Sequence, residues 1–370
     1  MATSTATASA KRDTVLDFWR GISILMVLLH HAVYFHFPVF KTLYPTALSA
    51  TQGIARVVLA ADKVLVWAAE RSGPLGVKIF FVISGYIITT ILLNEERKYG
   101  GISIRNFYLR RIFRILPAYF TYLAALSFFA FMGWIILDQS QLVYAFGFLC
   151  NTSISTCGWN IGHTWSLAIE EQFYIVWPIL FVLVSGKRRE YLLAAVLTAL
   201  LICSAFGIFT AFGWIDSALS FACIAVGALY ATSDGFRTFM QRYGWTTIIV
   251  LGLVSLVLYR FVPPAYEVVH QTYRLIQPFV ILSSIILSYR FARHIEGRAL
   301  IWISYLGLIS YSLYIWQELF LNEFSGYPAG SWFSNPLLMI PFVLCSYFLI
   351  ERPMIRWART YTKRELGPGI

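Results

Sequence analysis

Apolar segments of about 20 residues recur along the chain from Val15 to Glu351, and a basic or polar turn bounds each of them. A segment of this length can cross the hydrocarbon core of a bilayer as an α-helix. Hydrophobic residues make up 58% of the chain and charged residues only 13%, and the polar stretches are loops. The sequence therefore predicts an all-α fold, a polytopic membrane helical bundle without a separate soluble domain.

We expect about ten transmembrane helices. They cover Val15–Phe35, Pro74–Leu93, Ile115–Leu137, His163–Val184, Tyr191–Phe209, Ala218–Ala231, Thr246–Phe261, Leu275–Tyr289, Leu300–Phe320 and Pro336–Ile350. Ten helices place both termini on the same side. With the N-terminus inside, the inner segments hold 21 of the 29 lysines and arginines and the outer segments six, while Arg20 and Lys78 lie within spans. The positive-inside rule then favours an N-in, C-in topology.

The same pattern divides the chain into a disordered cytoplasmic tail (residues 1–12), a membrane domain (13–357) and a basic cytoplasmic tail (358–370). The net charge of +11 does not indicate nucleic-acid binding, because the arginines lie between apolar spans. Gly53–Glu70 has apolar residues at helical spacing and predicts an amphipathic helix on the outer surface or packed over the bundle. Cys150 and Cys157 share an outer segment, where they could form a disulfide or remain two thiols.

Two adjacent carboxylates, Glu170 and Glu171, interrupt the apolar stretch His163–Pro178. One acidic residue inside a lipid-spanning helix costs several kcal/mol, from roughly 3 upward, so the pair predicts a wet or protein-lined site. Helical spacing puts Ser166 on the same face as Glu170 and Tyr174 one turn further on. The alternative is that the helix begins outside the membrane and that water solvates both carboxylates.

The first span carries Arg20 and His31, which share a helical face and lie roughly 16 Å apart along its axis. Such a pair could bind an anion near one surface and transfer a proton near the other, since a neutral imidazole suits a general base. The alternative is that His31 is a polar residue bonded to a neighbouring helix.

Arginines also gather at the start of the third span. Arg111 and Arg114 lie one turn apart, and their forked guanidinium groups suit phosphate. Attraction to lipid headgroups would explain the same cluster. Combined with Arg20, the cluster favours a phosphorylated cytosolic ligand.

In their order along the chain, these motifs resemble the acyltransferase-3 family of integral membrane acyltransferases. The resemblance covers residues 13–357, and the block around Glu170 is its most specific part. The matching motifs are Asp17-x-x-Arg20-Gly21 with His31, Gly76–Gly85, Arg111-x-x-Arg114-x-x-Pro117, Trp165-Ser166-Leu167-x-x-Glu170-Glu171-Gln172-Phe173-Tyr174, Ser310-Tyr311-Ser312-x-Tyr314 and Glu351-x-Pro353.

The resemblance implies transfer of an acyl group, most often acetyl, from cytosolic acyl-CoA to a hydroxyl of a glycan or small molecule. It implies that His31 is a base or acyl carrier, with Glu170 and Glu171 as the acidic site residues and Glu170 paired with the imidazole. The residues expected to bind the acyl-CoA phosphates are Arg20, Arg111 and Arg114, and those expected to bind substrate are Trp165, Ser166, Tyr174, Tyr311, Tyr314 and Gln317. We expect no metal and no permanently bound cofactor.

Two features depart from the family pattern. Gln317 stands where relatives often carry a histidine, and some relatives continue into a soluble esterase-like domain, whereas we expect a stand-alone form here. The predicted location is the bacterial inner (plasma) membrane, with a site reached from both cytoplasm and periplasm. The expected partners are acyl-CoA, a cell-surface saccharide or other hydroxyl acceptor, the lipid bilayer, and polysaccharide-synthesis proteins or a second copy of the chain.

Two other functions fit the same residues. A transporter or flippase of glycans or small organic acids would use the buried polar groups as a translocation path, although we see no internal repeat. A non-catalytic subunit of a polysaccharide synthase would not require His31 for acylation.

Overall fold

The computed structural model describes residues 13–36, 54–152, 154, 155, 157–208, 210, 211, 215–261, 265–291, 298–321 and 335–365. The predicted tail 1–12 lies outside these residues. The described part is helical except for turns, short loops and a two-residue antiparallel pair, β1 (Thr210–Ala211) and β2 (Ile215–Asp216), as the all-α prediction requires.

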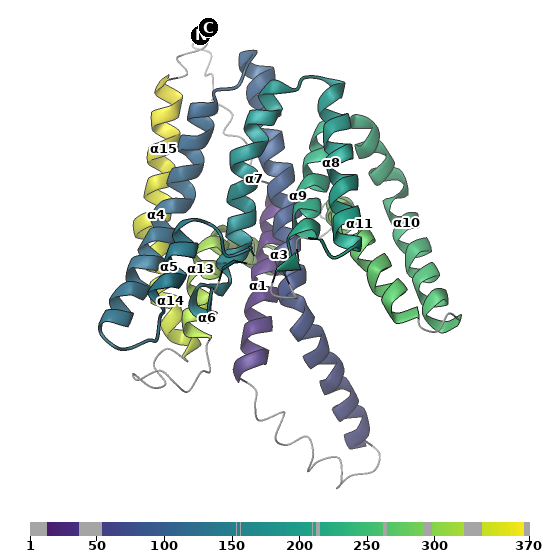
Figure 1. Cartoon of the computed structure of the whole chain (residues 1–370), viewed down its shortest axis with the longest axis horizontal. Helices are drawn as coiled ribbons and strands as arrows, with labels where there is room; N and C mark the ends of the chain where they lie inside the picture. The colour runs from purple at the N-terminus through teal and green to yellow at the C-terminus, as the bar shows by residue number, and fades with distance from the viewer. Residues whose placement is uncertain are drawn as a thin grey trace.

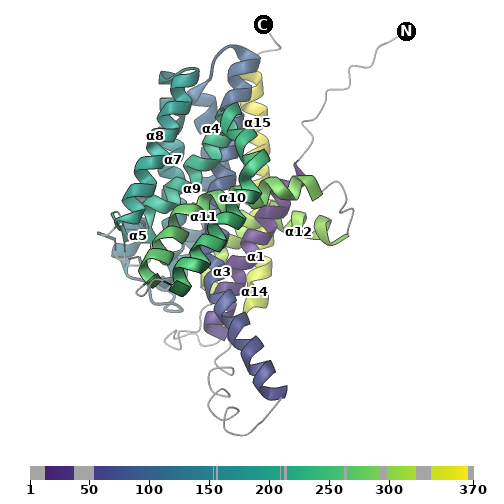
Figure 2. The same cartoon turned by 90° about the vertical axis from the view of Figure 1, so that its right-hand side faces the viewer.

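The helices form one bundle with α3 near its centre, α4 and α15 along one flank, and α10 and α11 along the other (Figure 1). Seen from the side, α12 lies next to α1 (Figure 2). The elements are α1 (Thr14–His36), α3 (Ile54–Tyr99), α4 (Ile104–Phe131), α5 (Gln139–Phe146), α6 (Trp159–Gly162), α7 (Thr164–Leu183), α8 (Lys187–Ala205), α9 (Ser217–Thr232), α10 (Asp234–Phe261), α11 (Ala265–Phe291), α12 (Arg298–Leu308), α13 (Ser310–Phe320), α14 (Pro336–Cys345), the π-helix η2 (Ser346–Glu351) and α15 (Arg352–Glu365).

Several of these helices can cross a membrane. Within the described residues, five helical stretches are long and apolar enough, and α9 with the first part of α10 makes a sixth candidate, bent by 108°. The five are Thr14–Ala32, Arg71–Tyr99, Ile104–Phe131, Trp159–Leu183 and Pro336–Thr362. These lengths support a multi-pass membrane protein. The full set of ten spans stays a prediction.

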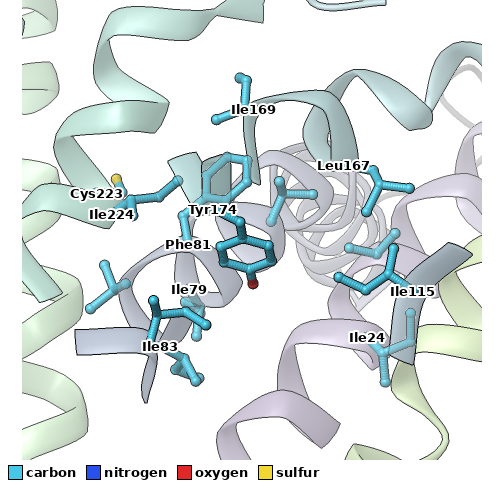
Figure 3. Packing of buried hydrophobic residues seen from close by; sticks show 14 of the residues in the cluster. Ile24, Ile79, Phe81, Ile83, Ile115, Leu167, Ile169, Tyr174, Cys223 and Ile224 are labelled. Atoms are coloured by element: carbon cyan, nitrogen blue, oxygen red, sulfur yellow. The ribbon is translucent and has the colours of Figure 1, made fainter. Parts of the chain in front are cut away.

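Glycines allow α3 and α9 to approach closely. A methyl group added at Gly85 of α3 would collide with the carbonyl of Ile224, and one added at Gly227 of α9 would collide with the carbonyl of Val82. The missing side chains at these two positions therefore permit the close approach of the two helices. Around this crossing, apolar side chains of α3, α7 and α9 pack together, and Phe81 and Tyr174 are among them (Figure 3).

A second pair of glycines joins α1 to α12. A side chain at Gly21 would collide with the carbonyl of Ile303, and one at Gly307 would collide with the carbonyl of Asp17. This contact holds the first turns of α1, which carry Arg20, against the helix that precedes α13. The two crossings therefore fix α3 against α9, and α1, which carries Arg20 and His31, against α12.

Two predicted helix boundaries are wrong at their N-terminal ends. The helix of the third span begins at Ile104 and not at Ile115, because Ser103 caps it by accepting a hydrogen bond from the Asn106 amide at 3.3 Å. The predicted amphipathic helix is not separate, because α3 runs without a break from Ile54 through Pro74 to Tyr99.

Two further spans differ from the prediction, one in its middle and one at its C-terminal end. The ninth span is split at Ile309, where the Ser310 hydroxyl donates to the Gly307 carbonyl at 2.9 Å and competes with the helical backbone bonds. The last span does not end at Ile350, because η2 carries the helix into α15 as far as Glu365. Residues 358–365 of the predicted basic tail are therefore helical.

Candidate functional site

A cavity of about 100 Å³ lies among α1, α3, α4, α7 and α13. The structure brings together eight of the predicted site residues in its lining: Arg20, Arg111, Arg114, Ser166, Glu170, Tyr174, Tyr311 and Tyr314. These residues come from four helices that are far apart in the sequence. The remaining walls are mostly apolar side chains of α3, so the polar groups face one another across a small space.

Three cations line this cavity. The Arg20 guanidinium donates to the Ser310 hydroxyl at 3.2 Å and lies 4.0 Å from the Asp17 carboxylate. The Arg111 guanidinium lies 5.3 Å from the centre of the Tyr174 ring. Arg114, one turn further along α4, completes the set. Three guanidinium groups around one space create a local positive potential that favours an anionic ligand.

The two adjacent carboxylates diverge, because successive residues of a helix point about 100° apart. Glu170 faces the cavity and accepts hydrogen bonds from the Ser84 hydroxyl and the Tyr174 hydroxyl. Glu171 points elsewhere, and its Oε1 atom is buried with no hydrogen-bond partner among the described residues. Of the pair, only Glu170 is therefore placed to act in this cavity.

His31 lies in a separate polar cluster at the other end of α13. Its Nδ1 atom is 2.9 Å from Oε1 of Gln317, and its Nε2 atom is 3.6 Å from Oε1 of Glu318. The expected pairing of His31 with Glu170 is wrong in this structure. The carboxylate against the imidazole is Glu318, because α13 and not α7 packs its polar face against this part of α1.

Glu318 also holds a second histidine. Its Oε2 atom is 2.7 Å from Nδ1 of His163 and accepts from the His163 backbone amide at 3.1 Å. The indole N–H of Trp159 donates to the Glu318 carbonyl at 3.0 Å. His163 and Glu318 are both buried, at 3% and 4% exposure, so water reaches neither directly. One buried carboxylate thus lies between two imidazoles.

Tyr314 connects this cluster to the arginine-lined cavity. Its hydroxyl lies 2.6 Å from the Ser166 hydroxyl and donates to the His163 carbonyl at 2.9 Å. Its ring centre is 5.5 Å from that of His163. A run of contacts therefore leads from the cavity through Tyr314, His163 and Glu318 to His31.

The remaining predicted residues lie outside the cavity lining. Trp165 packs edge-on against Phe81, with ring centres 6.1 Å apart, and Gln317 faces His31. Sequence reasoning missed His163 and Glu318. Both had a usable signal, because each is a titratable residue that adjoins a matched motif within an apolar run. Among the described residues, no group of three or more metal-ligating side chains is arranged to hold a metal ion.

Comparison with known proteins identifies the family. A family described as "Acyltransferase domain" matches residues 13–351. The chain is 37% identical over 161 residues to "Putative peptidoglycan O-acetyltransferase YrhL" of Bacillus subtilis, covering 38% of this chain and 24% of that protein. It is 37% identical over 136 residues to an uncharacterized protein of Haemophilus influenzae, covering 33% of this chain and 55% of that protein.

A third relative is a "Putative O-acetyltransferase" of Staphylococcus aureus strain COL, 34% identical over 141 residues, with 32% of this chain and 22% of that protein covered. The chain thus spans less than two thirds of each of these three relatives. No solved structure matches it significantly. Because the acyltransferase domain matches nearly the whole chain, the protein belongs to the acyltransferase-3 family.

Proposed function

We propose that the protein is a membrane O-acyltransferase that moves an acyl group, in the first instance acetyl, from cytosolic acyl-CoA to a hydroxyl of a cell-surface saccharide. The observation that carries this proposal is the single cavity lined by Arg20, Arg111 and Arg114, which Tyr314 connects to the His31 cluster. Family membership gives the reaction class. The name of one relative includes peptidoglycan, which supports a saccharide as the first acceptor to test.

The arginines fit the donor of such a reaction. Acyl-CoA carries phosphates, and guanidinium groups bind phosphate through paired charge-assisted hydrogen bonds. Cavities that enclose whole ligands usually measure about 300–1,000 Å³. A cavity of about 100 Å³ therefore fits the acyl thioester, and the phosphates would meet the arginines where the donor enters.

The His31 cluster fits the chemical step. A neutral imidazole takes the proton of the acceptor hydroxyl while the hydroxyl oxygen attacks the thioester carbonyl. The carbon–sulfur bond breaks, the sulfur leaves with the electron pair, and the imidazolium returns the proton to give free CoA thiol. Glu318 orients the imidazole and stabilises its protonated form. Transfer through an acyl-imidazole on His31 uses the same residues and gives the same products, free CoA thiol and the acylated acceptor.

The proposal includes access to the site from two sides. His31 is not among the described residues that line the cavity. The Ser166–Tyr314 contact would therefore separate to let the thioester reach His31. The acceptor would approach from the far end of α1. With ten spans and an N-in, C-in topology in a bacterial inner membrane, the donor would enter from the cytoplasm and the acceptor from the periplasm.

The test uses the purified full chain in lipid nanodiscs with acetyl-CoA and peptidoglycan fragments. Release of CoA thiol and acetylation of the saccharide would be measured together. His31→Ala should abolish turnover and keep acetyl-CoA binding, whereas Arg114→Ala should weaken binding. Arg188→Ala, at an exposed arginine at the start of α8, is the matched control.

The opposite pattern, with binding lost in His31→Ala and retained in Arg114→Ala, would contradict the assigned roles. Movement of saccharide across the membrane of sealed vesicles without CoA release would instead support the transporter. A purified chain that acetylates nothing, together with saccharide acetylation in cells that His31→Ala leaves unchanged, would support a non-catalytic subunit.

A further inference from the structure

A second, larger cavity lies on the other side of α3. Its volume is about 800 Å³, and α1, α3, α9, α10 and α11 surround it. Ile83 lines both this cavity and the arginine-lined one, so α3 is the wall between them. All the predicted site residues lie outside its lining.

Three arginines give this cavity a basic end. Arg97 lies in the last turn of α3, where it is exposed and makes no ion pair with any described residue. Arg237 lies 2.9 Å from Asp234 and donates to the Ala231 carbonyl at 2.6 Å. Arg290 donates to the Gln241 carbonyl. Residues of α9 and α10 therefore hold Arg237 and Arg290 in place.

Asp13 is the one acidic residue in the described lining, and its carboxylate is already engaged. It accepts from the Tyr289 hydroxyl at 2.6 Å and from the amides of Val15 and Leu16 at the start of α1, at 3.1 and 3.2 Å. Three arginines against this one carboxylate leave the net formal charge of the lining positive.

The opposite end of the cavity is apolar. Along α3 the lining begins with Val82 and Ile83 and reaches Arg97 roughly 22 Å further along the helix axis. Along α11 it begins with Leu282 and ends with Arg290. The two helices run in the same direction in Figure 1, so their apolar residues gather at one end and their cations at the other.

We propose that this cavity binds an amphiphile with an anionic phosphate head group and a hydrocarbon tail. The head would contact Arg97, Arg237 and Arg290, and the tail would lie on the apolar side chains of α3 and α11. Basic pockets between transmembrane helices on the cytoplasmic side bind the head groups of anionic phospholipids in this way. Two sources share the chemistry, an anionic phospholipid of the bilayer and a long-chain acyl-CoA. The proposal does not depend on the acyl-transfer reaction.

The experiment is native mass spectrometry of the full chain in detergent, with phosphatidylglycerol and phosphatidylcholine of identical acyl chains. We expect phosphatidylglycerol adducts to dominate. Arg97→Gln should weaken them about fivefold, the effect of one arginine near an anionic lipid surface. Arg242→Gln is the matched control, because Arg242 is exposed on α10 and lies outside the cavity lining.

A second variant tests the apolar end. Ile286→Trp adds bulk to the tail region and should lower lipid binding without changing the head-group charges. Repeating the titration with palmitoyl-CoA distinguishes a bilayer phospholipid from a long-chain acyl-CoA as the ligand. The ligand that uses this cavity is the one whose binding falls in Arg97→Gln and not in Arg242→Gln. Equal binding of the two phospholipids with no palmitoyl-CoA effect, or equal losses in the two arginine variants for every ligand, would overturn the proposal.

Discussion

At the scale of single residues, the contacts of Glu318 explain why a carboxylate is stable in a buried position. A carboxylate that is 4% exposed loses its hydration and is stable only if donors replace the lost water. The His163 amide and the two imidazoles supply polar contacts on both of its oxygens. Glu318 therefore orients His31 and His163 relative to each other, and the histidines stabilise the buried carboxylate in return.

Glu318→Gln tests this role with little change of shape. The amide cannot stabilise an imidazolium as a carboxylate does, so turnover should fall at least about a hundredfold, within the range of general acid–base contributions. The Michaelis constant for acetyl-CoA should stay close to that of the wild type, because Glu318 lies outside the arginine-lined cavity. Steady-state CoA release measures both quantities.

Glu96→Gln is the control for that substitution. Glu96 pairs with Arg189 at 3.0 Å on a more exposed part of α3, far from His31 in the sequence. Similar losses of turnover in the two variants would show a structural effect and contradict the role of Glu318.

The arginines and carboxylates of the site show how much of it could be predicted from the sequence. Helical periodicity and residue type were enough to select Arg20, Arg111 and Arg114, which the structure gathers around one cavity. That they bind an anion stays a prediction. Which carboxylate meets His31 depends on which helices touch, and a single sequence does not contain that information. Glu170 carried the stronger motif signal, yet Ser84 and Tyr174 occupy it.

At the scale of helices, the close crossing of α3 and α9 depends on two missing side chains. Gly85→Ala and Gly227→Ala would each place a methyl group against a main-chain carbonyl, which cannot move as a flexible side chain does. Each should lower the free energy of unfolding by about 1–3 kcal/mol, as overpacking does. Thermal unfolding in detergent measures the effect. Gly101→Ala is the control, because nothing lies within 4 Å of its added methyl group. Equal midpoints for all three variants would contradict the crossing.

The segment between α5 and α6 gives another prediction at this scale. Cys150 and Cys157 form a disulfide in the structure, while Cys203, Cys223 and Cys345 are free. Under denaturing conditions, thiol labelling should therefore find three cysteines without reductant and all five with it. Mass spectrometry counts the labels, and Cys150→Ser should expose one additional thiol without reductant. Identical labelling with and without reductant would exclude the disulfide.

Helix boundaries show where prediction from sequence stops. The span from His163 to Val184 was predicted to within one residue of α7, because Gly162 precedes it and Ser185-Gly186 follow it. The break between α12 and α13 was missed, because apolar residues continue on both sides of Ile309 and the local bond of Ser310 to Gly307 leaves no mark in hydropathy.

At the scale of the whole molecule, α3 organises the bundle. It separates the arginine-lined cavity from the larger amphiphilic one, and its Ile83 side chain contributes to both. On the far flank, α15 returns along α4, with the rings of Phe113 and Trp357 4.6 Å apart (Figure 1). The end of α15 therefore lies on the same side of the bundle as the start of α4, and the sidedness of one determines that of the other.

The N-in, C-in topology can be tested across the whole bundle with two variants that each carry one free cysteine. Ser140 and Arg188 are exposed, precede and follow the span of α7, and should lie on opposite sides of the membrane. The basic run at the start of α8 should stay in the cytoplasm. In intact cells, a membrane-impermeant maleimide should label Ser140→Cys, whereas Arg188→Cys should react only after permeabilisation. Both variants are made with the three free cysteines replaced by alanine. Labelling of Arg188→Cys and not Ser140→Cys in intact cells would invert the topology, and the donor could then not enter from the cytoplasm as proposed.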